Sequence, residues 1–381
     1  MTVCLPLQGN VPNLLSTFGF DSSNRILSHS TTFRYETIAT GNAWAVGTNA
    51  LPATPLILNE TGTGPNWHTQ VSPSSGNVGS LNGVDFVDGD NGWAVGADVV
   101  GVNSTSTIIR TSNGGTNWTA QTSPMGLGVF NDVDFVDVNN GWIVGTASAS
   151  PGAPYIARTT NGGSSWVAQT AAGGEVSAVD FISTTTGWAA GVTTLGAPLV
   201  LATTNAGTTW SAVATGIGTG TLTDIEFRSS TVGWGVGSAS GQPLIIYTTN
   251  GGASWSTGAI SLPAPLGGVL NAVDFVSATQ GWAVGNEVDP SDVTRTLTFI
   301  LTTVDGGANW TRQSPPVQIG SLAGVDMLDA STGYAVGVNQ SGLVAPYILK
   351  TTNGGSSWVV QTPSVTQGTL LDVSYAPQTD E

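Results

Sequence analysis

The sequence contains few ionisable residues and only one thiol. Lysine and arginine together number 8 among 381 residues, against 24 aspartates and glutamates, so the formal net charge is −16. A field of that sign repels nucleic acid and anionic membrane surfaces, and we expect neither as a partner. The single cysteine, Cys4, excludes a disulfide framework and a cysteine-ligated metal site.

Targeting and membrane-spanning signals are also missing. No run of eighteen apolar residues is present, so no membrane insertion is expected. Residues 1–20 carry no basic residue ahead of an apolar stretch, which argues against a secretory signal. The abundance of Thr, Ser, Gly and Asn is nevertheless typical of exported or particle-surface proteins. We therefore expect a virion-surface or extracellular location, reached without a visible signal peptide.

Signatures of catalysis are scarce as well. The two histidines, His29 and His68, fall in expected outer strands, and no His-x-x-x-His, Gly-x-Ser-x-Gly or phosphate-loop motif occurs. The segment Arg25-Ile26-Leu27 lacks the proline and the preceding aromatic residue that a sialidase would show. The sequence therefore predicts no enzyme, no catalytic residue, no cofactor and no bound metal.

The sequence is highly repetitive, and all thirteen tryptophans lie in two repeated motifs. Two motifs alternate along the chain. The first is Trp-x-Val/Ala-Gly, with Tyr334 replacing tryptophan in the seventh copy; its tryptophans are Trp44, Trp93, Trp142, Trp188, Trp234 and Trp282. The second is Thr-x-Asn-Gly-Gly-x-x-Trp or a remnant of it; it ends at Trp67, Trp118, Trp166, Trp210, Trp255, Trp310 and Trp358.

Each repeat has the pattern of four short strands, here called A to D. In one copy these are Leu81–Val87, Gly92–Ala97, Thr107–Thr111 and Asn117–Thr122, with Gly- and Asn-rich turns between them. An acidic residue in strand A recurs every 46 to 52 residues, at Glu36, Asp85, Asp134, Asp180, Glu226, Asp274, Asp326 and Asp372. Four strands in such a period predict an all-β fold, a β-propeller of four-stranded antiparallel blades.

The two kinds of marker disagree on the number of blades. The aromatic motifs count seven and the strand-A acids count eight, because Thr369–Tyr375 forms a further strand A with only a short tail after it. We predict eight blades: residues 33–367 form seven tandem repeats, residues 368–381 supply the innermost strand of a closing blade and a tail, and residues 1–32 supply its outer strands. The alternative is seven blades, with residues 1–30 as an arm.

The strand-A acids would line a central channel, where they would either bind cations or hold the blades together. In Val84-Asp85-Phe86 the acid lies between residues that face the adjacent blade. A carboxylate in such a place needs hydrogen-bond partners. We therefore predict a structural role for these acids.

The segment Thr159–Trp166 (TTNGGSSW) resembles the Asp-box, or BNR repeat, Ser/Thr-x-Asp-x-Gly-x-x-Trp. Asparagine replaces the aspartate at Asn113, Asn161, Asn205, Asn250 and Asn353, whereas Asp305 keeps the acid and the first copy (Glu60–Trp67) is degraded. Together with the Gly-Trp-Ala-Val-Gly motif, the pattern resembles the Ycf48/photosystem II stability factor type of propeller from Thr32 onwards. The resemblance implies that the boxes are structural and lie away from any active site.

Binding is expected at the loops that vary. In a propeller the B–C and D–A connections share one face, and here they differ in length between repeats. The longest B–C loop, Asn286–Thr296, contains Glu287, Asp289, Asp292 and Arg295; its acids either ligate calcium or form a solvated charged loop, and their spacing fits no EF-hand. Three other loops of low charge contribute the candidate contact residues Asn103, Pro154 and Gln340.

Three functions fit these features. The first is a non-enzymatic structural or protein-interaction propeller on a particle or cell exterior, a virion decoration or receptor-engaging protein that has a protein partner in a repeating assembly. The alternative is a Ycf48-like assembly factor for a membrane protein complex, as the resemblance implies. The second alternative is a glycan-binding or sialidase-like propeller, although every tryptophan is already used by the repeats.

Overall fold

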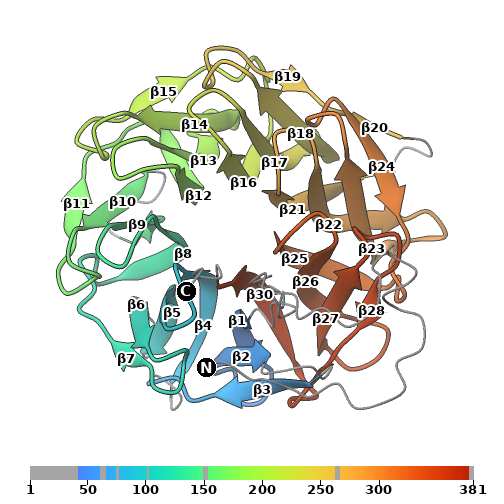
Figure 1. Ribbon diagram of the computed structural model, residues 1–381, viewed down its shortest axis with the longest axis horizontal. Helices are drawn as coiled ribbons and strands as arrows, with labels where there is room; N and C mark the ends of the chain where they lie inside the picture. Colours follow the sequence, from blue (N-terminus) through green and yellow to red (C-terminus); the bar gives the residue numbers. More distant parts are fainter. Residues whose placement is uncertain are drawn as a thin grey trace, which may run out of the picture. The chain divides into compact units, whose positions relative to one another are not determined.

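The computed structural model describes residues 42–60, 66–73, 77–100, 103–148, 153–261 and 267–376. These lie within one compact unit, Thr40–Glu381; the other unit, Met1–Ala39, falls outside the described residues. Seven sheets, each with four antiparallel strands, surround a central axis as the blades of a β-propeller (Figure 1). No helix that could cross a membrane occurs within these ranges.

Each blade consists of strands A to D, from the axis outwards. Blade 1 is β30 (Gly368–Tyr375), β1 (Ala43–Asn49), β2 (Pro55–Glu60) and β3 (Asn66–Gln70); blade 2 is β4 (Val78–Phe86), β5 (Asn91–Val100), β6 (Asn103–Ser112) and β7 (Thr119–Ala120); blade 3 is β8 (Gly128–Phe135), β9 (Gly141–Ala147), β10 (Tyr155–Thr159) and β11 (Val167–Gln169); blade 4 is β12 (Gly174–Phe181), β13 (Gly187–Thr193), β14 (Pro198–Thr203) and β15 (Ser211–Val213).

The remaining blades follow the same order. Blade 5 is β16 (Thr221–Phe227), β17 (Gly233–Ala239), β18 (Gln242–Thr248) and β19 (Ser256–Thr257); blade 6 is β21 (Gly268–Phe275), β22 (Gly281–Asp289), β23 (Asp292–Thr303) and β24 (Asn309–Gln313); blade 7 is β25 (Gly320–Met327), β26 (Thr332–Asn339), β27 (Ala345–Thr352) and β28 (Val359–Val360). Two short strands, β20 (Ala259–Ile260) and β29 (Thr362–Pro363), lie outside strand D of blades 6 and 1.

The prediction of eight blades is wrong, because the C-terminal strand does not start a blade of its own. Strand β30 pairs antiparallel with β1, which places Ser374 opposite Trp44. It thereby occupies the strand-A position of blade 1, and the ring closes with seven blades. The outer strands predicted for residues 1–32, and the acid Glu36, lie outside the described residues.

Packing between blades explains the aromatic motifs. Trp93 of strand B stacks on Phe135 in strand A of the next blade, with ring centroids 3.6 Å apart and an interplanar angle of 8°. Trp166 of that next blade meets the same phenylalanine edge-on at 5.8 Å. Burying one such indole contributes at most about 4–6 kcal/mol, from roughly 150–250 Å² removed from water. The alternating motifs are therefore the two sides of one interface.

Close contact between strands A and B explains why the Trp-x-Val/Ala-Gly motif ends in glycine. In strand B of blade 2, a Cβ added at Gly96 would collide with the carbonyl oxygen of Ser80 in strand A. Strand A bulges at this height, where the register shifts between Leu81 and Gly83. The glycine allows the two backbones to approach closely beside the bulge.

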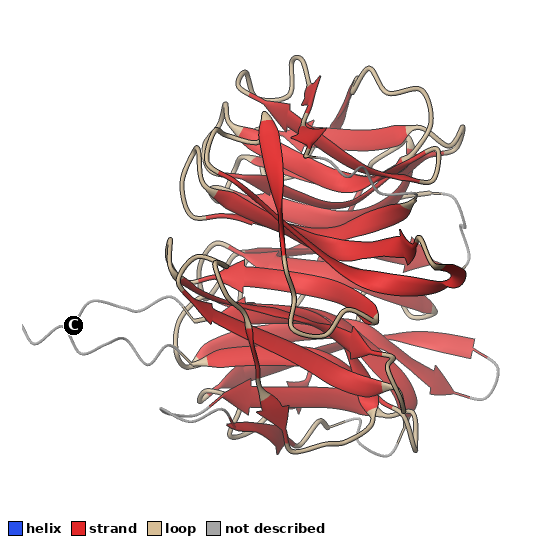
Figure 2. Ribbon diagram, turned by 90° about the vertical axis from the view of Figure 1, so that its right-hand side faces the viewer, coloured by secondary structure: helices blue, strands red, loops and turns tan. Residues whose placement is uncertain are grey.

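The ring has two faces, and Figure 2 shows it edge-on with the strands running from one face to the other. We call the face with the A–B and C–D turns the box face, and the face with the B–C and D–A connections the loop face. On the box face the two turns of a blade are tied together, as by the Gly162 amide donating to the Asn139 carbonyl at 2.9 Å. On the loop face the Gly268 amide donates to the Gly241 carbonyl of the preceding blade at 3.0 Å.

Candidate functional site

The Asn-containing boxes use up their own polar groups. In blade 3 the Thr159 hydroxyl donates to Asn161 Oδ1 at 3.0 Å and accepts from the Gly163 amide at 2.9 Å. The Asn161 Oδ1 also accepts from the Ser165 amide at 2.9 Å. Gly162 and Gly163 have φ values of 64° and 83°, which favour glycine. The box therefore closes a turn with its own side chains, in agreement with the predicted structural role.

The boxes of blades 2, 3, 4, 6 and 7 are also tied to the preceding blade. The Gly162 carbonyl accepts from Trp93 Nε1 at 3.1 Å and from Gln121 Nε2 at 3.0 Å. Sequence reasoning missed this glutamine, although a Trp-x-x-Gln spacing marks it. Glutamines at the same place bond the next box from Gln70, Gln169 and Gln313.

The strand-A acids connect neighbouring blades through the backbone. Asp85 Oδ2 accepts from the Phe135 amide in the next strand A at 2.8 Å. The same bond is made to the next blade by Asp134, Asp180, Asp274 and Asp326. Glu226 differs: its Oε1 lies 3.8 Å from Arg228 Nη1. The five aspartates are interblade links, as the structural prediction requires.

Asp372 belongs to a different set from the one that the sequence predicts. The Phe86 amide donates to Ser374 Oγ, so Ser374 takes the strand-A acid position in β30. Asp372, two residues earlier, instead accepts from the Val84 amide at 2.8 Å. Asp132 and Asp224 do the same for the amides of Val179 and Val273. These three aspartates form a second, partial ring, in blades 1, 3 and 5.

Burial changes the ionisation of both rings. It raises the pKa of Asp85 and of Asp180 to about 7, and the amide bonds offset only part of the effect. Burial likewise raises the pKa of Asp132 and of Asp224 to about 7, and that of Asp326 to about 6. Burial, reinforced by neighbouring carboxylates, raises the pKa well above the usual range in Asp134, Glu226, Asp274 and Asp372.

These rings do not have the geometry of a cation site. A depression of about 440 Å³ at the box-face end of the channel is lined by Asp274, Asp326 and Arg228, which supplies a positive charge there. No group of three or more histidines, cysteines, aspartates or glutamates placed to hold a metal ion occurs among the described residues. The carboxyls bond to the backbone of the next blade rather than converging on one point.

The predicted loop Asn286–Thr296 is a long hairpin with a tip at Pro290 and Ser291. Asp289 Oδ1 accepts from the Ser291 amide at 2.8 Å and from its hydroxyl at 2.6 Å. Asp292 Oδ1 accepts from the Thr294 amide at 3.1 Å. The two acids therefore close turns separately and do not form a shared calcium site.

The structure brings some of the other candidate residues together and separates the rest. Glu287 forms an ion pair with Arg312 of β24, and Arg295 lies 3.9 Å from Asp292. Gln340 of blade 7 accepts from the Thr296 hydroxyl at 3.4 Å, so it joins the hairpin of blade 6. Asn103 starts β6 in blade 2 and Pro154 precedes β10 in blade 3, away from that cluster.

The loop face carries exposed leucines that sequence reasoning did not single out. Leu51, Leu195 and Leu343 are 85%, 90% and 73% exposed, each in the B–C loop of a different blade. The signal was a leucine three or four residues before the proline at or near the start of strand C. On the box face, Val304 is the comparable residue, at 76% exposed. Each of the three leucines therefore exposes a large apolar side chain on the loop face, in a separate blade.

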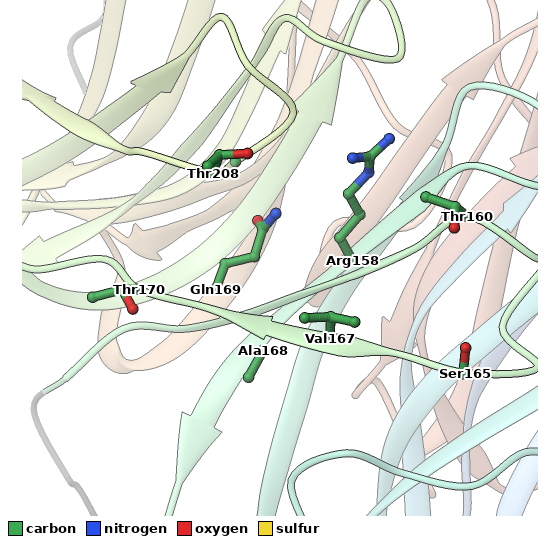
Figure 3. A pocket seen from close by; sticks show the side chains of 9 residues that line it. Arg158, Thr160, Ser165, Val167, Ala168, Gln169, Thr170 and Thr208 are labelled. Carbon is green, nitrogen blue, oxygen red and sulfur yellow. The ribbon is translucent and has the colours of Figure 1, made fainter.

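A groove of about 410 Å³ lies at the rim, between the outer strands of blade 3 and the box of blade 4. Arg158 of β10 and Gln169 of β11 point into it, whereas Ala168 points the opposite way (Figure 3). Thr208 of the blade 4 box forms the far wall. Arg158 also lies over the Trp142 ring at 5.3 Å and donates to Asn140 Oδ1 at 3.3 Å.

Comparison with known proteins identifies one matching family and solved structures of similar fold. The family described as "Photosynthesis system II assembly factor YCF48" matches residues 116–217 and 216–373. YCF48 from Cyanidioschyzon merolae superposes with a TM-score of 0.55 at 17% identity, over 78% of this chain and 88% of that one. A structure described as YCF48 bound to D1 peptide gives 0.52 at 19% identity, over 80% and 95%. No curated protein matches the sequence.

Proposed function

The family match spans more than half of the chain, so the chain belongs to the YCF48 family, and on this premise we propose that it is a non-enzymatic assembly factor. In this proposal it holds a protein subunit of a membrane complex while the complex forms. The family match is the observation that carries the proposal. The structure described as YCF48 bound to D1 peptide supports a protein segment as the partner, since that relative holds one.

The loop face is the surface we assign to the partner. A partner that covers the loop face removes the side chains of Leu51, Leu195 and Leu343 from water. This burial contributes about 1.5–3 kcal/mol of binding free energy per leucine. Three such residues in three blades suit a broad contact rather than a pocket for a small substrate. The box face is a poorer choice, because among the described residues Val304 is its one apolar side chain of comparable exposure.

The missing signal peptide, the scarcity of lysine and the uncharged loops favoured a virion decoration, but the comparisons support the assembly-factor alternative better. The glycan alternative gains nothing from the surface, because the large exposed hydrophobic residues in the described ranges are leucines and valines. Sugar binding by stacking needs an exposed aromatic ring. In the channel, the carboxylates of Asp85 and Asp134 are bonded to the backbone of the neighbouring blade.

A triple variant, Leu51→Glu, Leu195→Glu and Leu343→Glu, should lose the partner. Three charges would be placed in the contact, at a cost far above the lost apolar burial. The measurement is affinity capture from membranes of the cells that contain the protein, with quantitative mass spectrometry. We expect at least about a tenfold loss of the captured subunit, equivalent to about 1.4 kcal/mol.

The matched control is Val304→Glu, an equally exposed apolar residue on the box face. It should capture the same subunit as the unaltered chain. Equal capture by the triple variant would show that the partner does not use the loop face. Capture of a capsid protein in place of a membrane-complex subunit would contradict the assembly-factor proposal.

A further inference from the structure

Two blades carry a fifth strand on their outer edge. Strand β20 pairs in parallel with β24 of blade 6, and β29 pairs in parallel with β3 of blade 1. Each added strand belongs to the connection that arrives from the preceding blade; β20 is visible outside β24 in Figure 1. The outer edge of a blade therefore accepts an extended segment in this fold.

Both added strands dock in the same way through a serine. In blade 6 the Ser261 amide donates to the Trp310 carbonyl at 2.9 Å, and the Arg312 amide donates to Ser261 Oγ at 3.4 Å. In blade 1 the Ser364 amide donates to the Trp67 carbonyl at 2.8 Å, and the Thr69 amide donates to Ser364 Oγ at 3.0 Å. The acceptor edge is thus defined by the box tryptophan and the residue two places after it.

Blade 3 presents the same edge without a fifth strand from the described part of the chain. Its acceptor groups are the Trp166 carbonyl and the Ala168 amide. In β11, Val167 and Gln169 pair with Arg158 and Ile156 of β10. Gln121 in blade 2 corresponds to Gln169. Its backbone amide donates inward, to the Ile108 carbonyl of strand C. Alternation along a strand then directs Trp166 and Ala168 backbone groups outward.

From this geometry we infer that the outer edge of β11 binds an extended segment of the partner protein as a parallel fifth strand. The inference deepens the proposed function, on which it rests, by assigning a second contact for the same partner. An unpaired strand edge offers a row of hydrogen-bonding groups, and adding a strand to it is a recurrent way of binding peptides. The groove of about 410 Å³ beside β11 provides room for alternate side chains of the segment.

The chemistry of the segment follows from the two strands that already bind in this way. Ala259–Ile260 and Thr362–Pro363 carry no charge, and a serine follows each pair. Arg158 lines the groove, and its positive charge disfavours a basic residue in the bound segment. The partner segment is therefore extended and free of basic residues, with a serine or threonine placed to bond the Trp166 carbonyl and the Ala168 amide.

The test uses a capped peptide with the sequence of residues 256–261, STGAIS, titrated against the full chain labelled with ¹⁵N. We expect saturable shifts of the amide signals of Val167, Ala168 and Gln169. Ala168→Pro removes the outward amide while a proline remains acceptable on an edge strand. This substitution should lower the affinity for the peptide at least about tenfold, because one hydrogen bond is lost and the proline ring blocks the edge sterically.

The matched control is Ala212→Pro, which has the same place relative to Trp210 in β15 of blade 4. It should leave the peptide affinity within about twofold, and both variants must keep the amide spectrum of a folded propeller. Absent shifts in β11, or equal loss in both variants, would overturn the assignment. If Ala168→Pro still captures the native partner fully while the loop-face variant does not, this inference fails and the proposed function stands. If the unaltered chain captures no partner, the proposed function itself fails.

Discussion

A chain that ends at Gln367 should lose its cooperative fold. Such a chain lacks β30, the strand that supplies strand A of blade 1. Leu370, Val373 and Tyr375 are buried, and each contributes about 1.5–3 kcal/mol. That sum approaches the whole stability of an ordinary domain, about 5–15 kcal/mol.

The truncation would also remove links to blade 2. The amides of Val84 and Phe86 would lose Asp372 and Ser374 as acceptors, and β1 would become an open inner edge. Tryptophan fluorescence and near-ultraviolet circular dichroism, followed against temperature, measure the effect. The control is a chain that ends at Ala376, which keeps β30 entire. A cooperative transition in the shorter chain within a few degrees of the control would contradict a ring closed by β30.

Stability should rise when the pH falls from 8 to 5, opposite to the usual acid response. Burial raises the folded-state pKa of Asp85, Asp180 and other channel carboxyls to about 7, above the usual value of an unfolded aspartate. The folded chain then binds more protons than the unfolded chain between about pH 4 and pH 7. The stabilisation is fully present below the unfolded pKa and is lost as the pH rises through the folded one.

The size of this effect can be bounded. If the pKa of each of three carboxyls is one unit higher in the folded chain than in the unfolded chain, the free energy of unfolding rises by about 4 kcal/mol. For a domain of this length that free energy raises Tm by about 5 °C. Differential scanning calorimetry at pH 8 and pH 5 measures it. A Tm that falls over this range would show that the channel carboxyls ionise as ordinary surface acids do.

A pair of variants separates the channel from the rest of the surface. Asp85→Asn with Asp180→Asn keeps an oxygen for the Phe135 and Phe227 amides but cannot become charged, so the dependence of Tm on pH should flatten. Asp305→Asn gives its box the residue that other boxes carry, and hydrogen bonds from Asn309 lower the pKa of Asp305. That control should retain the rise towards pH 5.

The four-stranded repeat could be predicted from sequence, but the blade count could not. Residues two apart in a strand face the same side, so Asp372 and Ser374 of β30 both face the neighbouring blade. The eight-blade count assigned Glu36 and Asp372 to the inner strands of two different blades, whereas β30, which carries Asp372, is itself the inner partner of β1. The sequence also could not show that β1 has its inner partner at the far end of the chain.

The proposed contact surface was predictable only in part. The choice of the loop face followed from the topology and from the variable loop lengths. Its leucines were missed, because a single leucine in a loop of Gly and Pro is ordinary. The structure is needed to show that the side chains of Leu51, Leu195 and Leu343 are exposed in these loops. The acids of the blade 6 hairpin attracted attention by their charge, yet Asp289 and Asp292 close their own turns.

Hydrogen exchange of the complex with the captured subunit tests the central claim most directly, because it shows which face the partner covers. The account predicts slower exchange in the B–C loops at residues 49–55, 193–198 and 339–345, with the box turns at residues 113–115 and 353–355 unchanged. Slower exchange confined to the box turns, with the B–C loops unchanged, would contradict it.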